Sequence, residues 1–166
     1  MSVSKFTDRD EIRQLVATYT AAGDQRRNDL RAHIWAEDAV MVLPVWRAEG
    51  RLGILKALGA GAAQAAAAIA EGRPEPMIRH HITSSLVTFD GPDEATGRSY
   101  WINFSEKGPD HSGLYADRYR RIDGAWKIVF REVRIDWKAA DSRLGAEMRV
   151  GPRPPELGPV PVITAD

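Results

Sequence analysis

The sequence contains no cysteine and only four histidines, so it offers few side chains that are typical of nucleophilic or acid–base catalysis. Two of its four histidines, His80 and His81, are adjacent in a segment whose composition predicts a strand. Neighbouring strand residues point to opposite faces of a sheet, so only one of the two can enter a cavity inside the fold. From the residues alone, one is expected to be a hydrogen-bonded core histidine and the other to be exposed. His33 and His111 are expected to be solvated surface residues.

Asp24 is a carboxylate in an unusual place. It lies near the end of the first predicted helix, where a negative charge opposes the helix macrodipole, so local structure does not require it. A histidine held by an aspartate is a plausible general base, because the carboxylate fixes the tautomer and stabilises the imidazolium. Sequence spacing cannot bring Asp24 to a histidine; only the fold can. The alternative is a solvated helix end beside Arg26 and Arg27.

Arg131 is predicted to lie on an apolar face of the last strand, in alternation with Val129, Val133 and Ile135. Burying an unpaired guanidinium is unfavourable, so this side chain should meet a negative charge. Two partners remain open: an anionic part of a ligand, or Asp117 across the strands.

Composition and missing motifs narrow the function classes. Lys plus Arg is 23 and Asp plus Glu is 23, so no net charge attracts nucleic acid or an anionic membrane. No dinucleotide loop, Walker loop or nucleophile elbow is present, and the histidine pair lacks the carboxylates of a metal site. No run of 18 apolar residues predicts a membrane span, and the first ten residues lack an apolar signal core. We therefore expect a cytoplasmic protein that needs no cofactor and no metal.

The elements that must position these side chains follow from periodicity and turn residues. A chain of 166 residues can bury about 70% of its surface, which is enough for one core with one deep pocket. The segment at 138–166 holds five of the ten prolines and is predicted to be an extended tail. The predicted helices are 8–26, 29–34 and 53–71, and the predicted strands are 38–43, 78–89, 95–105, 113–122 and 125–137. This order predicts an α+β fold in which helices cover one face of a curved sheet and enclose a pocket for a small apolar ligand.

Five segments of the chain resemble a known family. They are IRQLVATYTAAGD (12–24), WAEDAVMV (35–42), HHITS (80–84), GLYADRY (113–119) and DGAWKIVFREVRIDW (123–137). Their order and spacing are similar to the SnoaL-like branch of the NTF2-like superfamily, in the style of scytalone dehydratase and hexachlorocyclohexane dehydrochlorinase. The resemblance implies a cone-shaped α+β barrel at 1–137, with a curved antiparallel sheet wrapped around the N-terminal helices.

The resemblance also implies a function: a cofactor-independent lyase, a dehydratase or related enzyme, acting on a small aromatic or polycyclic molecule. Asp24 and His81 match an Asp–His pair that serves as general base. Arg131 matches an assisting arginine and Tyr19 a pocket residue beside the pair, so all four are implied catalytic residues. Asn103 falls where scytalone dehydratase carries its second histidine, and the sequence departs from that pattern there. The residues expected to contact the substrate are Asn103, Tyr115, Trp46 and Trp101.

Two alternatives to the lyase remain at this stage. One is a non-catalytic module of the same fold that binds a hydrophobic ligand or serves in assembly; the other is a polyketide cyclase or isomerase with the same base. Relatives of this kind form dimers or trimers through the open sheet face, so self-association is expected. Geometry separates the first alternative from an enzyme. A catalytic pair opens onto a cavity, with nitrogen and oxygen about 2.6–3.2 Å apart, whereas a sealed pair favours the binding module.

Overall fold

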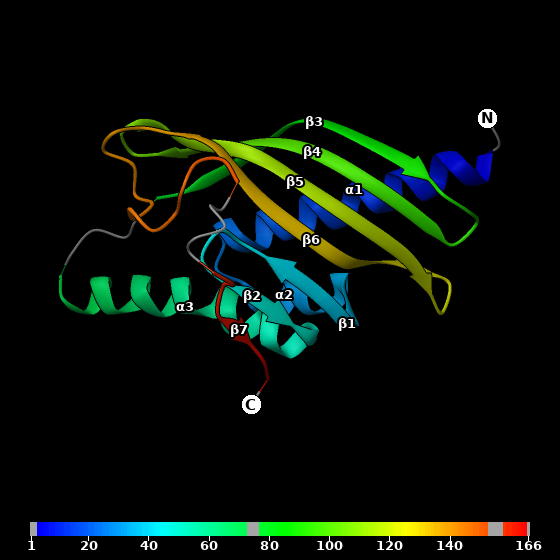
Figure 1. Ribbon diagram of the computed structural model, residues 1–166, viewed down its shortest axis with the longest axis horizontal. Helices are drawn as coiled ribbons and strands as arrows, with labels where there is room; N and C mark the ends of the chain where they lie inside the picture. The colour runs from blue at the N-terminus through cyan, green and yellow to red at the C-terminus, as the bar shows by residue number, and fades with distance from the viewer. Residues whose placement is uncertain (1–2, 73–76, 153–157, 166) are drawn as a thin grey trace.

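Helices from the N-terminal half cover one face of a long, twisted sheet in the computed structural model (Figure 1). The structure describes residues 3–72, 77–152 and 158–165. The helices are α1 (Val3–Asp24), α2 (Asn28–Arg31), the 3₁₀ turn η1 (Ala32–Ile34) and α3 (Gly50–Ala70). The strands are β1 (Trp35–Val42), β2 (Arg47–Glu49), β3 (Arg79–Phe89), β4 (Glu94–Ser105), β5 (Gly108–Ile122), β6 (Ala125–Lys138) and β7 (Val162–Ile163).

The first helix forms where the apolar spacing predicts it. Ile12, Val16, Tyr19 and Ala22 recur on one side of α1 and are buried against the sheet. The helix begins at Val3, earlier than predicted, and ends at Asp24. This end places Asp24 at the edge of the core, next to the first residues of β3.

One sheet contains all the strands of the described residues, in the order β3-β4-β5-β6-β1-β2-β7. The predicted antiparallel arrangement is confirmed for β3 to β6, and the sheet curves without closing. A two-residue turn joins β5 to β6, in which Asp123 and Gly124 have φ angles of 50° and 80°. Two pairings are parallel and were not predicted, β1 with β6 and β2 with β7.

Some predicted boundaries are wrong, and the largest difference lies at the start of β5. The segment 106–112, predicted to be a loop, contains a tight turn followed by the beginning of β5 at Gly108. Gly108 has a φ of 113°, a conformation open mainly to glycine, so the chain reverses there at once. The C-terminal segment is also more ordered than predicted, because Val162–Ile163 adds β7. The parts of this predicted tail at 153–157 and 166 lie outside the described residues.

The alanine-rich segment forms α3, which packs against β1 and β2. Ala65 and Ala68 are buried, so small side chains let the helix approach its neighbours closely. Among the described residues, α3 is also the one helix whose length and hydropathy would suffice to cross a membrane. In this structure α3 contacts β1, β2 and β7.

Candidate functional site

Asp24 and His80 form a hydrogen-bonded pair where α1 ends beside β3. The Nδ1 atom of His80 lies 2.6 Å from Oδ1 of Asp24, and the backbone N–H of His80 donates to both carboxylate oxygens at 3.2 and 3.1 Å. A carboxylate accepts, so Nδ1 carries the hydrogen, and in the neutral ring Nε2 keeps a lone pair. No described residue hydrogen-bonds Nε2. The two side chains are 21% and 16% exposed, so the pair is accessible rather than sealed.

The histidine in this pair is His80, and the assignment of His81 to it is wrong. His81 is exposed, and its ring contacts Phe104 edge-on at 5.2 Å between centroids. The reason is strand alternation: His80 shares its face with Ile78 and Ile82, which are half-buried, so His81 must point to the other face.

A second histidine stands in the same row of the sheet. Strand register places His80 opposite Asn103, and Asn103 opposite His111. The Nδ2 atom of Asn103 donates to Nε2 of His111 at 2.7 Å. Neighbouring strands are about 4.8 Å apart, so the two imidazoles are separated by roughly 10 Å along this row. The structure thus contradicts the expectation that His111 is a solvated surface residue, since it is only 6% exposed.

His111 has its own aspartate, Asp110. Its Nδ1 lies 2.6 Å from Oδ2 of Asp110, and the carboxylate also accepts from the Ser142 hydroxyl at 2.6 Å and the Arg143 backbone N–H at 2.9 Å. Adjacent strand residues normally face opposite ways, but the register shifts between Asn103 and the next residue, which leaves Asp110 unpaired as a β-bulge. The bulge buries Asp110 and His111 together, and the segment after β6 fixes the carboxylate.

Burial and hydrogen bonding shift the pKa values of both groups in this second pair. Burial lowers the pKa of His111 below its usual value, and Asp110 only partly opposes this effect. The positive charge that His80 can carry lowers it slightly further. Burial acts to raise the pKa of Asp110, but the hydrogen bonds from Ser142, Arg143 and His111 hold it below its usual value. At neutral pH His111 is therefore a neutral imidazole that donates to a charged carboxylate.

These shifts predict how the free energy of unfolding depends on pH. The folded protein disfavours protonated His111, so neutral His111 contributes to the free energy of unfolding. This contribution is complete above about pH 6.5 and is lost as the pH falls towards the lowered pKa. Urea titrations between pH 7.5 and 5.5 should show stability decreasing by up to about 1.4 kcal/mol per pH unit from this group. The variant His111→Gln should flatten the profile, whereas His33→Gln should not. An unchanged slope in His111→Gln would contradict the assignment.

A cavity of about 730 Å³ joins the two histidine pairs. It lies between the end of α1, α2, the second half of α3, and the adjoining ends of β3, β4 and β5. Ala65 and Ala68 form part of its wall, so the small side chains of α3 leave room for a ligand. Its polar lining includes Tyr19, Asp24, Arg31, His80, Asn103 and His111. Two imidazoles and an amide thus face one ligand-sized space.

Arg131 does not line this cavity; it lies in the core at 0% exposure. Its Nε and Nη2 atoms donate to the two oxygens of Asp117, each at 2.7 Å. Burial acts to lower the pKa of Arg131, but the negative charge of Asp117 outweighs burial and raises it. Of the two partners that the sequence allows for Arg131, the structure shows Asp117. It does not show the contact with a ligand that a catalytic role implies.

Of the predicted aromatic contacts, Tyr19 lines the cavity, and Tyr115 and Trp101 pack behind it. Tyr115 packs edge-on against Tyr19 at 5.5 Å and stacks on Trp101 at the same separation. Trp101 also packs edge-on against His111 at 5.5 Å, which holds that ring in place. Trp46 packs against the core and is not a lining residue. Asn103 and Tyr19 are thus the predicted residues besides Asp24 that reach the space.

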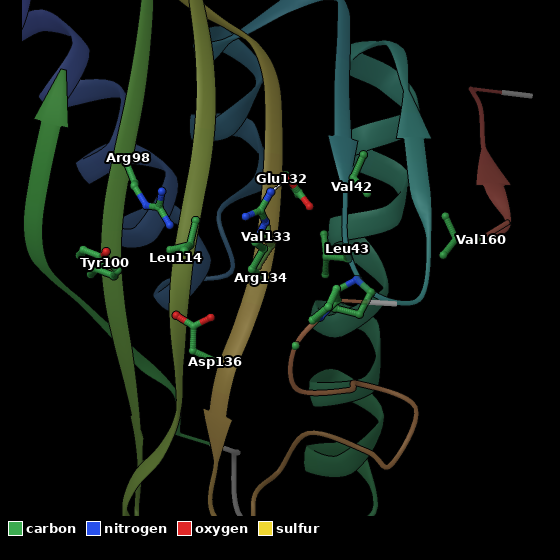
Figure 2. Close-up of a pocket in the computed structure, with 13 residues that line it drawn as sticks. Val42, Leu43, Arg98, Tyr100, Leu114, Glu132, Val133, Arg134, Asp136 and Val160 are labelled. Atoms are coloured by element: carbon green, nitrogen blue, oxygen red, sulfur yellow. Dashed lines mark hydrogen bonds and ion pairs between the residues drawn. The ribbon is translucent and has the colours of Figure 1, made fainter. Parts of the chain in front are cut away.

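A second hollow, of about 640 Å³, lies on the opposite face of the sheet (Figure 2). Tyr100 and Leu114 lie on its floor, and α1 is behind the strands in this view. Its charged side chains include Arg134 and Glu132, which pair with each other at 2.8 Å. It contains no histidine, so the inner cavity is the candidate active site. Nowhere in the described residues do three potential metal ligands come together.

A family profile described as the SnoaL-like domain matches residues 4–132. The chain belongs to the SnoaL-like family. The matched region includes Asp24, His80, Asn103 and His111 and ends before Ser142 and Arg143, which fix Asp110. No curated protein matches the chain.

Solved structures support the NTF2-like fold of this SnoaL-like protein. A variant of Rv3472 from Mycobacterium tuberculosis, whose function is unknown, is 26% identical with a TM-score of 0.67, over 86% of this chain and 84% of that one. A candidate scytalone dehydratase from Novosphingobium aromaticivorans is 22% identical with a TM-score of 0.72, over 93% and 100%. LinA is 20% identical with a TM-score of 0.60, over 85% and 95%. The last two similarities concern the fold.

Sequence reasoning missed His80, Asp110, His111 and Arg31 as site residues. A signal for His80 was present, since Ile78 and Ile82 flank it at the two-residue spacing of one strand face. The positions of Asp110 and His111 depend on a bulge, whereas Gly108 and Pro109, which directly precede them, predict a loop there. Arg31 belongs to a helix too short to show a periodic face.

Proposed function

We propose that this SnoaL-like protein is a cofactor-independent lyase that eliminates water or a similar small group from an aromatic or polycyclic molecule. The observation that carries the proposal is the Asp24–His80 pair, whose free Nε2 atom belongs to a ring that lines a cavity of about 730 Å³. A separation of 2.6 Å in an accessible pair matches the geometry of a general base rather than of a sealed structural pair. The fold similarity to a candidate scytalone dehydratase is consistent with this class of reaction.

The proposed elimination uses His80 twice. Its Nε2 lone pair takes a proton from a substrate carbon, and the electrons of that C–H bond form a C=C bond. The C–O bond to the neighbouring carbon breaks, and its electron pair leaves with the oxygen. The proton then moves from Nε2 to that oxygen, so that water departs and the imidazole becomes neutral again. Asp24 keeps Nδ1–H in place and stabilises the imidazolium between the two proton transfers.

His111 is proposed to hold the far end of the substrate. As a neutral ring that donates Nδ1–H to Asp110, it presents Nε2 as an acceptor, and the Asn103 amide donates to this nitrogen. A substrate hydroxyl could donate to the same nitrogen, with the Asn103 amide turning to the substrate. The roughly 10 Å between the two imidazoles suits a bicyclic or tricyclic molecule that lies across β4.

Asp24→Asn tests the pair. The amide can still accept the backbone N–H of His80, so we expect a folded protein, but its neutral side chain stabilises the imidazolium poorly. Turnover should fall by about 10²-fold or more, with the substrate affinity little changed. The measurement is loss of water by mass spectrometry on a panel of hydroxylated aromatic ketones and acids.

The matched control is Asp29→Asn, which removes an exposed carboxylate of α2 that pairs with Arg27 at 2.6 Å. It should leave turnover unchanged. Running the reaction in D₂O separates the alternatives: deuterium uptake into carbon without loss of water indicates an isomerase or cyclase. If neither water loss nor deuterium uptake occurs with any compound that binds, the protein is a binding module. Full activity of Asp24→Asn would contradict the proposed base.

A further inference from the structure

Arg31, the last residue of α2, is a buried guanidinium on the cavity wall that has no acidic partner in the described part of the chain. It is 7% exposed and lines the cavity. Its Nε donates to the backbone oxygen of Tyr19 at 3.4 Å, and its Nη1 to Oδ1 of Asn28 at 3.2 Å. None of the ion pairs among the described residues includes it. Arg131, which is also buried, has Asp117 as its partner instead.

A buried charge that lacks a counter-charge is costly, and proteins usually pair it or use it to hold a ligand. The two hydrogen bonds and the Tyr19 ring, whose centroid lies 5.0 Å from the guanidinium carbon, compensate only part of this cost. They also leave Nη2 without a hydrogen-bond partner among the described residues. Arg31 is therefore oriented by its neighbours and still able to donate.

Gly23 places this free nitrogen beside the proposed base. A Cβ atom at Gly23 would overlap Nη2 of Arg31, and it would lie 3.9 Å from Cε1 of His80. The guanidinium and the imidazole therefore approach each other over the one residue of α1 that has no side chain. A group bound to Nη2 therefore lies beside the same stretch of α1 as the imidazole of His80 and close to that ring.

The charge of Arg31 differs from that of Arg143, which also lines the cavity. Arg143 pairs with Glu106, whereas no described carboxylate pairs with Arg31. Asp24, the described carboxylate on the cavity wall, is hydrogen-bonded to His80. In a partly enclosed space a positive charge without a counter-charge favours an anionic ligand.

We propose that Arg31 binds a carboxylate of the substrate, so that the lyase acts on aromatic carboxylic acids. The reaction in this inference rests on the proposed function, whereas the binding of a carboxylate by Arg31 does not. The carboxylate supplies the negative charge that Arg31 lacks, through charge-assisted hydrogen bonds from Nη2. It also sets the adjacent part of the substrate beside Nε2 of His80, where the proton is removed.

The test compares 2-naphthoate with 2-naphthamide, which have the same shape but differ in charge. Isothermal titration calorimetry on the wild type should give a dissociation constant at least about tenfold lower for the acid. Arg31→Met should abolish this preference, and Arg31→Lys should retain part of it. Arg27→Gln, which removes an exposed positive charge four residues earlier, should change nothing.

Three results would overturn the inference: equal binding of acid and amide, persistence of the preference in a folded Arg31→Met, or no binding of either probe to the wild type at about 10 mM. The comparison of probes needs no variant, so misfolding of one cannot hide the answer. Asp24→Asn separates this inference from the proposed function. It should keep the preference for the acid while losing turnover. Turnover without any preference for acids would contradict only the role of Arg31. A preference for acids without turnover would contradict only the lyase.

Discussion

Replacing His80 with glutamine should lower turnover by about 10²–10⁴-fold, whereas the same replacement of His81 should leave it within about twofold of the wild type. The two residues are adjacent in sequence and have the same side chain, but β3 directs them to opposite faces of the sheet. Only His80 meets Asp24, at 2.6 Å, and only His80 lines the cavity. Glutamine is of similar size and cannot act as a base at neutral pH.

The neighbouring position supplies the control, since His81→Gln changes the same kind of side chain on the exposed face. Both variants should unfold near the melting temperature of the wild type, because neither residue belongs to the hydrophobic core. Deuterium exchange into a bound substrate in D₂O measures proton abstraction directly, so the comparison works before the leaving group is known. A larger loss in His81→Gln than in His80→Gln would restore the original assignment and contradict the geometry.

The sequence predicted the fold well wherever local patterns determine local structure. Apolar residues at helical spacing predicted α1, and the Asp123-Gly124 turn predicted the hairpin of β5 and β6. Features that depend on distant partners were missed. The segment Arg47–Glu49 is too short to show a pattern, and it becomes β2 only because β1 and β7 flank it.

The candidate site was predicted in part, for the same reason. Asp24 was identified because a carboxylate at a helix end needs an explanation that local structure does not supply. The choice between His80 and His81 depends on strand parity, and here the family resemblance outweighed the alternation that the flanking isoleucines indicate. His111 could not be found, because its burial depends on the bulge at Asp110 and on Ser142, 32 residues further along the chain.

The predicted catalytic role of Arg131 also differs from what the structure shows. Its ion pair gives the largest expected effect on stability. Replacing Asp117 with asparagine should lower the free energy of unfolding by about 3–5 kcal/mol, because it leaves the guanidinium buried without a counter-charge. Both side chains are 0% exposed, so water cannot compensate. The Tyr19 and Tyr115 rings, 4.3 and 4.4 Å from the guanidinium carbon, offer only weaker cation–π contacts.

Urea denaturation of a double-mutant cycle tests whether this loss comes from the pair or from packing. Arg131→Met combined with Asp117→Asn removes both charges, so the double variant should be more stable than Asp117→Asn alone. Arg120→Gln is the control for an exposed pair, since Arg120 contacts Asp38 at 2.9 Å on the surface and should cost less than about 1 kcal/mol. Additive losses in the cycle would mean that the two charges do not stabilise each other.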